Sequence, residues 1–165
     1  MMRILGIDPG LATMGWGLIR SEGHKPRFVA CGVITTQPDT PLPRRLSEID
    51  TQVAQLLSLY EPEAIVFEQL FFARNVTTAF TVGAARGVAI CRCANYTQQL
   101  FEYTPMQIKQ AVVGYGKAEK MQVQQMVKLL LGLPTHPKPD DAADAVAAAL
   151  THFNAGRFGQ HHLMK

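Results

Sequence analysis

Hydrophobic residues near the start of the chain fall into short runs separated by turn residues. Arg3–Asp8 is an apolar run that stops at Pro9-Gly10, which indicates a buried strand ending in a turn. Gly15–Arg20 and Phe28–Thr35 are apolar and partly β-branched, with turn residues at 21–24 between them, so they are predicted to pair as a hairpin. The chain therefore opens with three strands and no helix between them.

The rest of the chain alternates between helical patterns and strands. Apolar spacing predicts an amphipathic helix from Leu42 to Tyr60, and the apolar run within Glu63–Gln69 predicts a buried parallel strand. The later elements are predicted as a helix at Asn75–Asn95, a strand at Leu100–Thr104, a helix opened by Pro105, a helix around 123–130 and a helix from Asp140 or Asp141 to Asn154. Residues 157–165 are expected to be a frayed tail. This order predicts one α/β domain over residues 1–156, with a mixed five-stranded sheet flanked by helices.

Composition excludes several classes of protein. The 165 residues are 47% hydrophobic and 18% charged, which is ordinary for a globular domain large enough to bury a core. No run approaches the roughly 18 apolar residues of a membrane span, and the first residues lack a leader pattern, so a cytoplasmic protein with no membrane partner is expected. The three cysteines lack the paired spacing of a zinc site.

Charge is unevenly distributed along the chain, although the net charge is only +3. Residues 68–138 contain eight Lys or Arg against three Asp or Glu, whereas residues 1–67 contain six against seven and residues 139–165 contain two against three. A basic middle segment between acid-bearing ends suits a polyanionic partner. Lysines on solvated helix faces would give the same counts, so charge alone leaves both interpretations open.

Four carboxylates stand where an apolar element ends or faces inward. Asp8 and Glu68 each follow an apolar strand, so parallel pairing would bring them to one sheet edge, where open α/β sheets place ligands. Asp141 and Asp144 are three residues apart on a helix of alanine and valine, and therefore share a face. Clustered carboxylates stay ionised only beside a cation, and two Mg²⁺ or Mn²⁺ ions about 4 Å apart can act on a phosphoryl group. The pattern predicts a metal-dependent nuclease.

Each acid also has a structural explanation. Asp8 could cap a turn, Glu68 could pair with Arg74, and Asp140 and Asp141 are both good helix N-cap residues. Taken singly, each acid fits either interpretation.

Other motifs are open in the same way. Gly83 and Gly87, four apart, would let another backbone approach closely, either at a dimer interface or within the chain. The sequence Gly114-Tyr115-Gly116-Lys117 lacks the spacing of a phosphate-binding P-loop and is interpreted as a flexible loop. His152 follows the acids on the same predicted helix, and a satisfied core histidine is the favoured interpretation over a metal ligand.

Three motifs taken together resemble the RuvC-type Holliday junction resolvases. They are Gly6-Ile7-Asp8-Pro9-Gly10, Phe67-Glu68-Gln69 followed by Phe71 and Arg74-Asn75, and Asp141-Ala142-Ala143-Asp144-Ala145 followed by Thr151-His152. The likeness runs from about residue 3 to residue 154 in order and spacing. It implies a ribonuclease H-like fold and an endonuclease that resolves four-way DNA junctions by paired symmetrical nicks in recombination and repair, leaving 5′-phosphate ends.

The resemblance also implies roles for individual residues. The family's acidic positions correspond to Asp8, Glu68, Asp141 and Asp144, which would hold Mg²⁺, two ions per subunit with Mn²⁺ as a substitute, while an activated water attacks the phosphate. Asp140 is four residues from Asp144, but the family pattern Asp-x-x-Asp selects Asp141 and leaves the N-cap role to Asp140.

DNA contacts and partners follow from the same resemblance. Phe71 matches an aromatic residue that intrudes into the junction, and Lys109 and Lys120 match basic positions near the scissile bond, with Lys117 and Arg74 as lesser candidates. A homodimer would match the symmetry of the junction. The RuvAB branch-migration complex is the expected partner.

Two other classes of protein share parts of this pattern. Actin-like ATPases and sugar kinases also begin with a strand ending in Gly-Ile-Asp-x-Gly, but they need two such lobes, and 165 residues leave room for one. A junction-binding module that does not cut could keep the basic segment and dispense with the acids. ATP turnover without DNA would identify the first, and absence of strand cleavage the second.

Overall fold

The computed structural model describes residues 1–70 and 76–165. The strands are β1 (Arg3–Asp8), β2 (Thr13–Glu22), β3 (Lys25–Thr35), β4 (Ala64–Glu68) and β5 (Leu100–Tyr103). The helices are α1 (Leu42–Tyr60), α2 (Val76–Ala94), α3 (Pro105–Val113), α4 (Lys120–Leu131), α5 (Asp140–Ala155) and the 3₁₀ helix η1 (Gly156–His162). The α/β class and the order of elements are as predicted. None of the helices in the described part of the chain is long and apolar enough to cross a membrane.

The five strands form one mixed sheet with the order β3-β2-β1-β4-β5. β1 pairs antiparallel with β2, and β2 with β3, whereas β1 and β4, and β4 and β5, run parallel. The hairpin turn is shorter than predicted, because Ser21 and Glu22 still pair with β3. Gly23 in that turn has a φ of 61°, a left-handed conformation that glycine adopts without a steric penalty.

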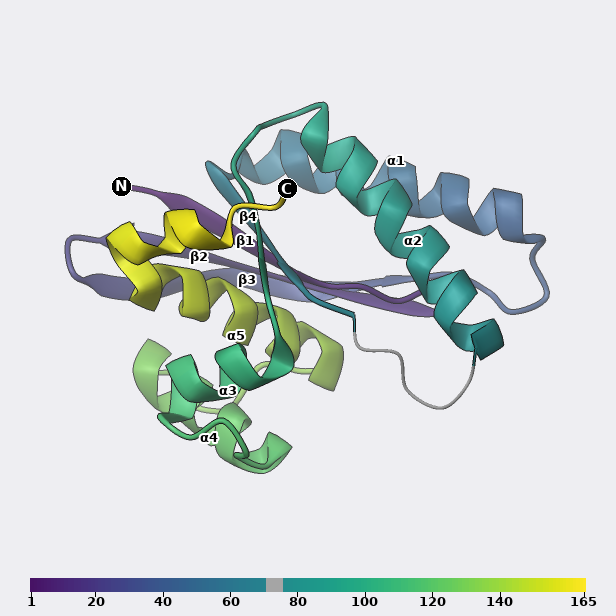
Figure 1. The fold of residues 1–165 in the computed structure, drawn as a ribbon. Helices are drawn as coiled ribbons and strands as arrows, with labels where there is room; N and C mark the ends of the chain where they lie inside the picture. Colours follow the sequence, from purple (N-terminus) through teal and green to yellow (C-terminus); the bar gives the residue numbers. More distant parts are fainter. Residues whose placement is uncertain (71–75) are drawn as a thin grey trace.

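Helices cover both faces of the sheet (Figure 1). α1 and α2 lie on one face, where Ile49, Val53 and Ala89 pack against the inward side chains of the strands. α5 lies directly on the other face, and α3 and α4 pack on its outer side (Figure 1). Every strand residue from Ile4 to Ile7 is therefore buried, as a strand covered on both faces should be.

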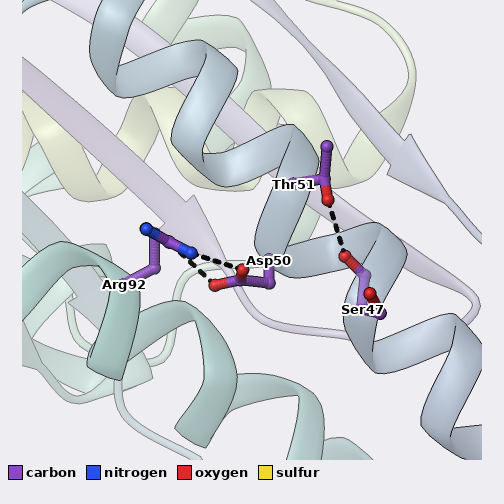
Figure 2. Close-up of polar contacts among 4 residues, drawn as sticks. All are labelled: Ser47, Asp50, Thr51 and Arg92. Carbon is purple, nitrogen blue, oxygen red and sulfur yellow. Dashed lines mark hydrogen bonds and ion pairs between the residues drawn. The ribbon is translucent and has the colours of Figure 1, made fainter.

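An ion pair ties α1 to α2 on their outer side (Figure 2). The Arg92 guanidinium donates two hydrogen bonds to the Asp50 carboxylate, at 2.8 and 2.5 Å, and this contact lowers the pKa of Asp50. Thr51, one residue on, donates to the backbone carbonyl of Ser47 at 3.0 Å (Figure 2). Both charged side chains are partly exposed, so the pair is expected to contribute little to stability.

Glycines on β1 and β2 let α5 lie against the sheet backbone. A Cβ atom at Gly6 would overlap the backbone carbonyl of Ala145, and one at Gly15 would overlap that of Asp141. The facing helix is correspondingly small-sided, with alanines buried along most of its length. The first turns of α5 are therefore held close to the ends of β1 and β2.

The end of the chain differs from the prediction of a frayed tail for residues 157–165, which is wrong. Residues 156–162 form η1, and Met164 donates a backbone hydrogen bond of 2.8 Å to Leu100 at the edge of β5. The ring of His162 stacks on Tyr103 with centroids 4.3 Å apart. Backbone pairing with the sheet edge and ring contacts hold this segment. Such contacts produce no hydrophobic periodicity in the sequence, so the pattern did not predict them.

Candidate active site

Asp8 and Glu68 end neighbouring parallel strands. Ile7 of β1 pairs with Phe67 of β4, so the next residue on each strand is Asp8 or Glu68. Parallel strands with this register deliver both side chains to the same edge of the sheet, which confirms the geometric prediction. Glu68 is also paired with Tyr103 of β5 at the end of that ladder.

The start of α5 brings two further acids to this edge. One carboxylate oxygen from each of Asp8, Asp141 and Asp144 lies within 4.8 Å of the other two. These three residues, called the acidic cluster below, come from β1 and from the first two turns of α5. Their meeting depends on the close approach of α5 to Gly15, because Asp141 is the residue that packs there.

Glu68 lies beside the acidic cluster rather than within that group of three. It lines a cavity of about 250 Å³ together with Asp144, Lys109 and Lys120. This cavity is called the lysine pocket below. It places two acids and two ammonium groups at the same edge of the sheet, within reach of a single bound group.

Burial and mutual repulsion raise the pKa values of Asp8, Glu68 and Asp144. Burial raises the pKa of the Asp8 carboxyl to about 8, and the negative charge of Glu68 adds to the rise. Burial likewise raises the pKa of Glu68 to about 7, with a further contribution from Asp144. Burial also raises the pKa of Asp144, and the hydrogen bond from Lys120 opposes it. A cation placed among these carboxylates would remove the repulsion.

The donor set fits hard divalent cations. All the gathered ligand atoms of the acidic cluster are carboxylate oxygens, which suit Mg²⁺ or Mn²⁺ and exclude a site built on soft thiolate ligands. The cluster is partly exposed, so a ligand can enter it. This corner of the molecule can therefore hold a divalent metal ion.

Asp140 has a different place from the one predicted for it. The N-cap of α5 is Pro139, whose carbonyl accepts hydrogen bonds from Ala142 and Ala143, so the predicted N-cap role of Asp140 is wrong. Asp140 is instead the first helical residue, and its Oδ1 accepts a hydrogen bond from Gln124 Nε2 at 3.0 Å. It links α5 to α4.

The predicted basic residues separate into groups. Lys109 and Lys120 line the lysine pocket, and Lys120 Nζ donates to Asp144 Oδ2 at 3.0 Å. Lys117 lies elsewhere, in a cavity of about 770 Å³ that it shares with Tyr103 and Tyr115. Phe71 and Arg74 lie outside the described residues. Sequence reasoning missed the contact of Lys120 with Asp144, because the two residues are 24 apart on different helices and no periodic pattern links them.

His152 is a core residue. It is 6% exposed, and its Nδ1 lies 2.9 Å from the hydroxyl of Tyr103, so the favoured interpretation of a satisfied core histidine is confirmed. Burial lowers its pKa to about 4, so the ring stays neutral near pH 7.

Comparisons with known proteins identify the family of this chain. The family model described as crossover junction endodeoxyribonuclease RuvC matches residues 4–152. The chain is 51% identical to the crossover junction endodeoxyribonuclease RuvC of Alkaliphilus metalliredigens, covering 95% of this chain and 96% of that protein. The solved structure of Thermus thermophilus RuvC in complex with a Holliday junction substrate superposes with a TM-score of 0.90 at 38% identity, covering 96% of this chain and 97% of that one.

Yeast mitochondrial Ydc2, a Holliday junction resolvase, has a TM-score of 0.70 at 14% identity, over 97% of this chain and 82% of that chain, and so shares the fold.

Proposed function

This chain belongs to the family of the crossover junction endodeoxyribonuclease RuvC, and from this premise we propose that it is a metal-dependent endonuclease that resolves four-way DNA junctions. The main support for this chemistry is the acidic cluster at the end of β1, in which one carboxylate oxygen of each residue lies within 4.8 Å of the other two. The family membership supplies the substrate, and the cluster supplies a site for phosphodiester hydrolysis.

We propose that Asp8, Glu68, Asp141 and Asp144 are the metal ligands and catalytic residues. Bound Mg²⁺ or Mn²⁺, in a two-ion arrangement, would activate water and neutralise charge on the scissile phosphate. The chain's own part is to hold these carboxylates rigidly: Asp8 and Glu68 on strands buried on both faces, and Asp141 and Asp144 on a helix packed against the sheet backbone. Such rigidity keeps ligand geometry unchanged during the reaction.

The lysine pocket is proposed to receive a DNA phosphate beside the acids. Lys109 and Lys120 approach the acids from α3 and α4, so a backbone phosphate bridging the two groups would meet cations on one side and the metal site on the other. Lys117, on the 114–119 loop, is proposed to contact DNA further along an arm. These contacts position the DNA without reading bases. Roles for Phe71 and Arg74 in the junction remain predictions from the resemblance.

We propose that the active form is a homodimer and that α2 provides its interface. Phe80 and Val76 on this helix are 75% and 70% exposed. Among the described residues, nothing lies within 4 Å of where a Cβ would stand on Gly83 or Gly87, so packing within the chain does not account for these glycines. A second copy of α2 can approach this face closely, and a two-fold dimer would present two active sites to opposed strands.

The function is tested by cleavage of a labelled four-way junction by the purified protein. Paired nicks with 5′-phosphate ends are expected with Mg²⁺ and none with EDTA. Asp8→Asn is expected to bind the junction and not to nick it, because asparagine keeps the shape and loses the negative charge. Nicking by Asp8→Asn at the parental rate would remove Asp8 from the metal site.

The alternative readings are not favoured. The family model over residues 4–152 and the 51% identical relative are both RuvC nucleases, which does not favour an actin-like kinase. A non-cutting module would have no use for buried carboxylates that repel one another. Contact with RuvAB stays an expectation of the family resemblance.

A further inference from the structure

Lys120 pairs with Asp144 in the structure, and it cannot keep this ion pair while it contacts a DNA phosphate. Its ammonium donates to Asp144 Oδ2 at 3.0 Å and lies 3.6 Å from Asp140 Oδ2. Asp144 belongs to the acidic cluster, where its negative charge and its oxygens are what a divalent cation needs. A lysine that pairs with Asp144 therefore neutralises part of the metal site.

The position of Lys120 allows it to leave. It is the first residue of α4, and its side chain is 52% exposed, whereas that of Asp144 is only 27% exposed. Four rotatable bonds let an exposed lysine reorient at little cost, while the carboxylate is held by the helix. Asp140, 63% exposed at the rim, remains within reach of the ammonium when the contact with Asp144 is broken.

Lys109 provides a contrast within the same pocket. It lines the lysine pocket beside Glu68, yet no ion pair of Lys109 is found among the described residues. The charge of Lys109 lowers the pKa of Glu68, but Lys109 makes no ion pair with Asp144. Lys120 is free only when Asp144 has another counter-ion.

We propose that Lys120 is a built-in counter-ion that competes with the divalent metal for Asp144, so that metal binding releases its ammonium toward the DNA phosphate. The proposal rests on the proposed function and adds an order to it, because metal loading and phosphate binding then strengthen each other. By thermodynamic reciprocity, a phosphate that draws Lys120 away from Asp144 also strengthens metal binding.

The test uses metal binding without DNA. Mg²⁺ is titrated calorimetrically into the full-length wild type and into Lys120→Met at pH 9. Burial lowers the pKa of Lys120, but the hydrogen bond and the negative charges of Asp144 and Asp140 outweigh it, so the pKa is raised and Lys120 stays charged at this pH. Lys120→Met is expected to bind Mg²⁺ about 3- to 10-fold more tightly, since one repelling positive charge is removed. Lys109→Met is the matched control, and its Mg²⁺ affinity is expected to change less than that of Lys120→Met, because Lys109 acts on Glu68 through its charge alone and makes no ion pair with Asp144.

Lys120→Arg keeps the charge and is expected to bind Mg²⁺ no more tightly than the wild type, which separates charge from any change in folding. A crystal structure with Mn²⁺ is expected to show Lys120 Nζ beyond hydrogen-bonding distance of Asp144. Two results would overturn the proposed competition between Lys120 and the metal while leaving the metal site intact. One is Mg²⁺ binding by Lys120→Met that is equal to or weaker than that of the wild type, and the other is a hydrogen bond from Lys120 to Asp144 that persists with Mn²⁺ bound. Failure of the wild type to bind Mg²⁺, or binding unaffected by Asp8→Asn, overturns the proposed metal site and the exchange with it.

Discussion

Two adjacent aspartates at the start of α5 differ in their contacts, which allows the proposed metal site to be tested residue by residue. Asp141 belongs to the acidic cluster, whereas Asp140 lies outside it, hydrogen-bonds to Gln124 on α4 and lies 3.6 Å from the ammonium of Lys120. Asp141→Asn is expected to lower junction cleavage about 100-fold or more, since even residues that only orient metal ligands cost 10–100-fold when changed. Asp140→Asn is the control and should retain most activity. Equal losses in both variants, measured at saturating Mg²⁺, would assign them a common role.

Stability of the protein without metal is expected to depend on pH through the same acids. Asp8 has an ordinary value of 3.8 that the folded protein raises to about 8, and Glu68 one of 4.5 that is raised to about 7. The folded state thus holds these protons more tightly than the unfolded chain, so the stability they contribute is complete below pH 4 and is lost as pH rises to about 8.

In EDTA, the Tm of the wild type should therefore fall between pH 5 and pH 8. The Tm of Asp8→Asn should fall less over the same range, because this variant lacks one of the two titrating groups. Mg²⁺ at pH 8 should restore the Tm of the wild type, because it binds the folded form only. A melting temperature that rises over this range specifically in the wild type would contradict the pKa assignments.

At the scale of elements, the contact of α5 with the sheet determines where the acids lie. Gly15 of β2 touches the backbone of Asp141, so Gly15→Ala must push the start of the helix outward. Overpacking of this kind costs about 1–3 kcal/mol, a loss of several degrees in Tm. Cleavage and Mg²⁺ affinity should fall further than stability, because the displaced residue is itself a proposed ligand. A variant with lower Tm and parental Mg²⁺ affinity would show that the acids tolerate a shift of α5.

Most elements could be predicted from local patterns, and the exceptions have physical reasons. The stripe of Leu42–Tyr60 and the run of Arg3–Asp8 matched the observed α1 and β1 because burial of one helix face or of a whole strand leaves a periodic trace. The tail after Gly156 left no such trace, since it is held by a stacked histidine ring and by backbone pairing with β5. The capping of α5 was mispredicted because Pro139 occupies the position that a good capping residue would have taken.

At the scale of the whole molecule, the α2 face is expected to control assembly. Gly87→Arg adds a charged side chain where nothing in the described chain stands within 4 Å, so the subunit should fold normally and fail to dimerise. Sedimentation should then give a monomer, and junction cleavage should lose its paired nicks. Leu129→Arg, on the exposed side of α4, is the control and should remain dimeric. A dimeric Gly87→Arg would place the interface on another surface.

Local sequence by itself determined the class of the fold, the order of its elements and the four candidate acids, because hydrophobic spacing and strand-ending carboxylates are properties of short segments. Only the tertiary structure decided that Asp8 meets Asp141 and Asp144, that Asp140 turns to Gln124, and that Lys120 reaches Asp144. These outcomes depend on how closely α5 and α4 approach the sheet edge. That distance is set by glycines and alanines packing across elements far apart in the chain, and no single segment encodes it.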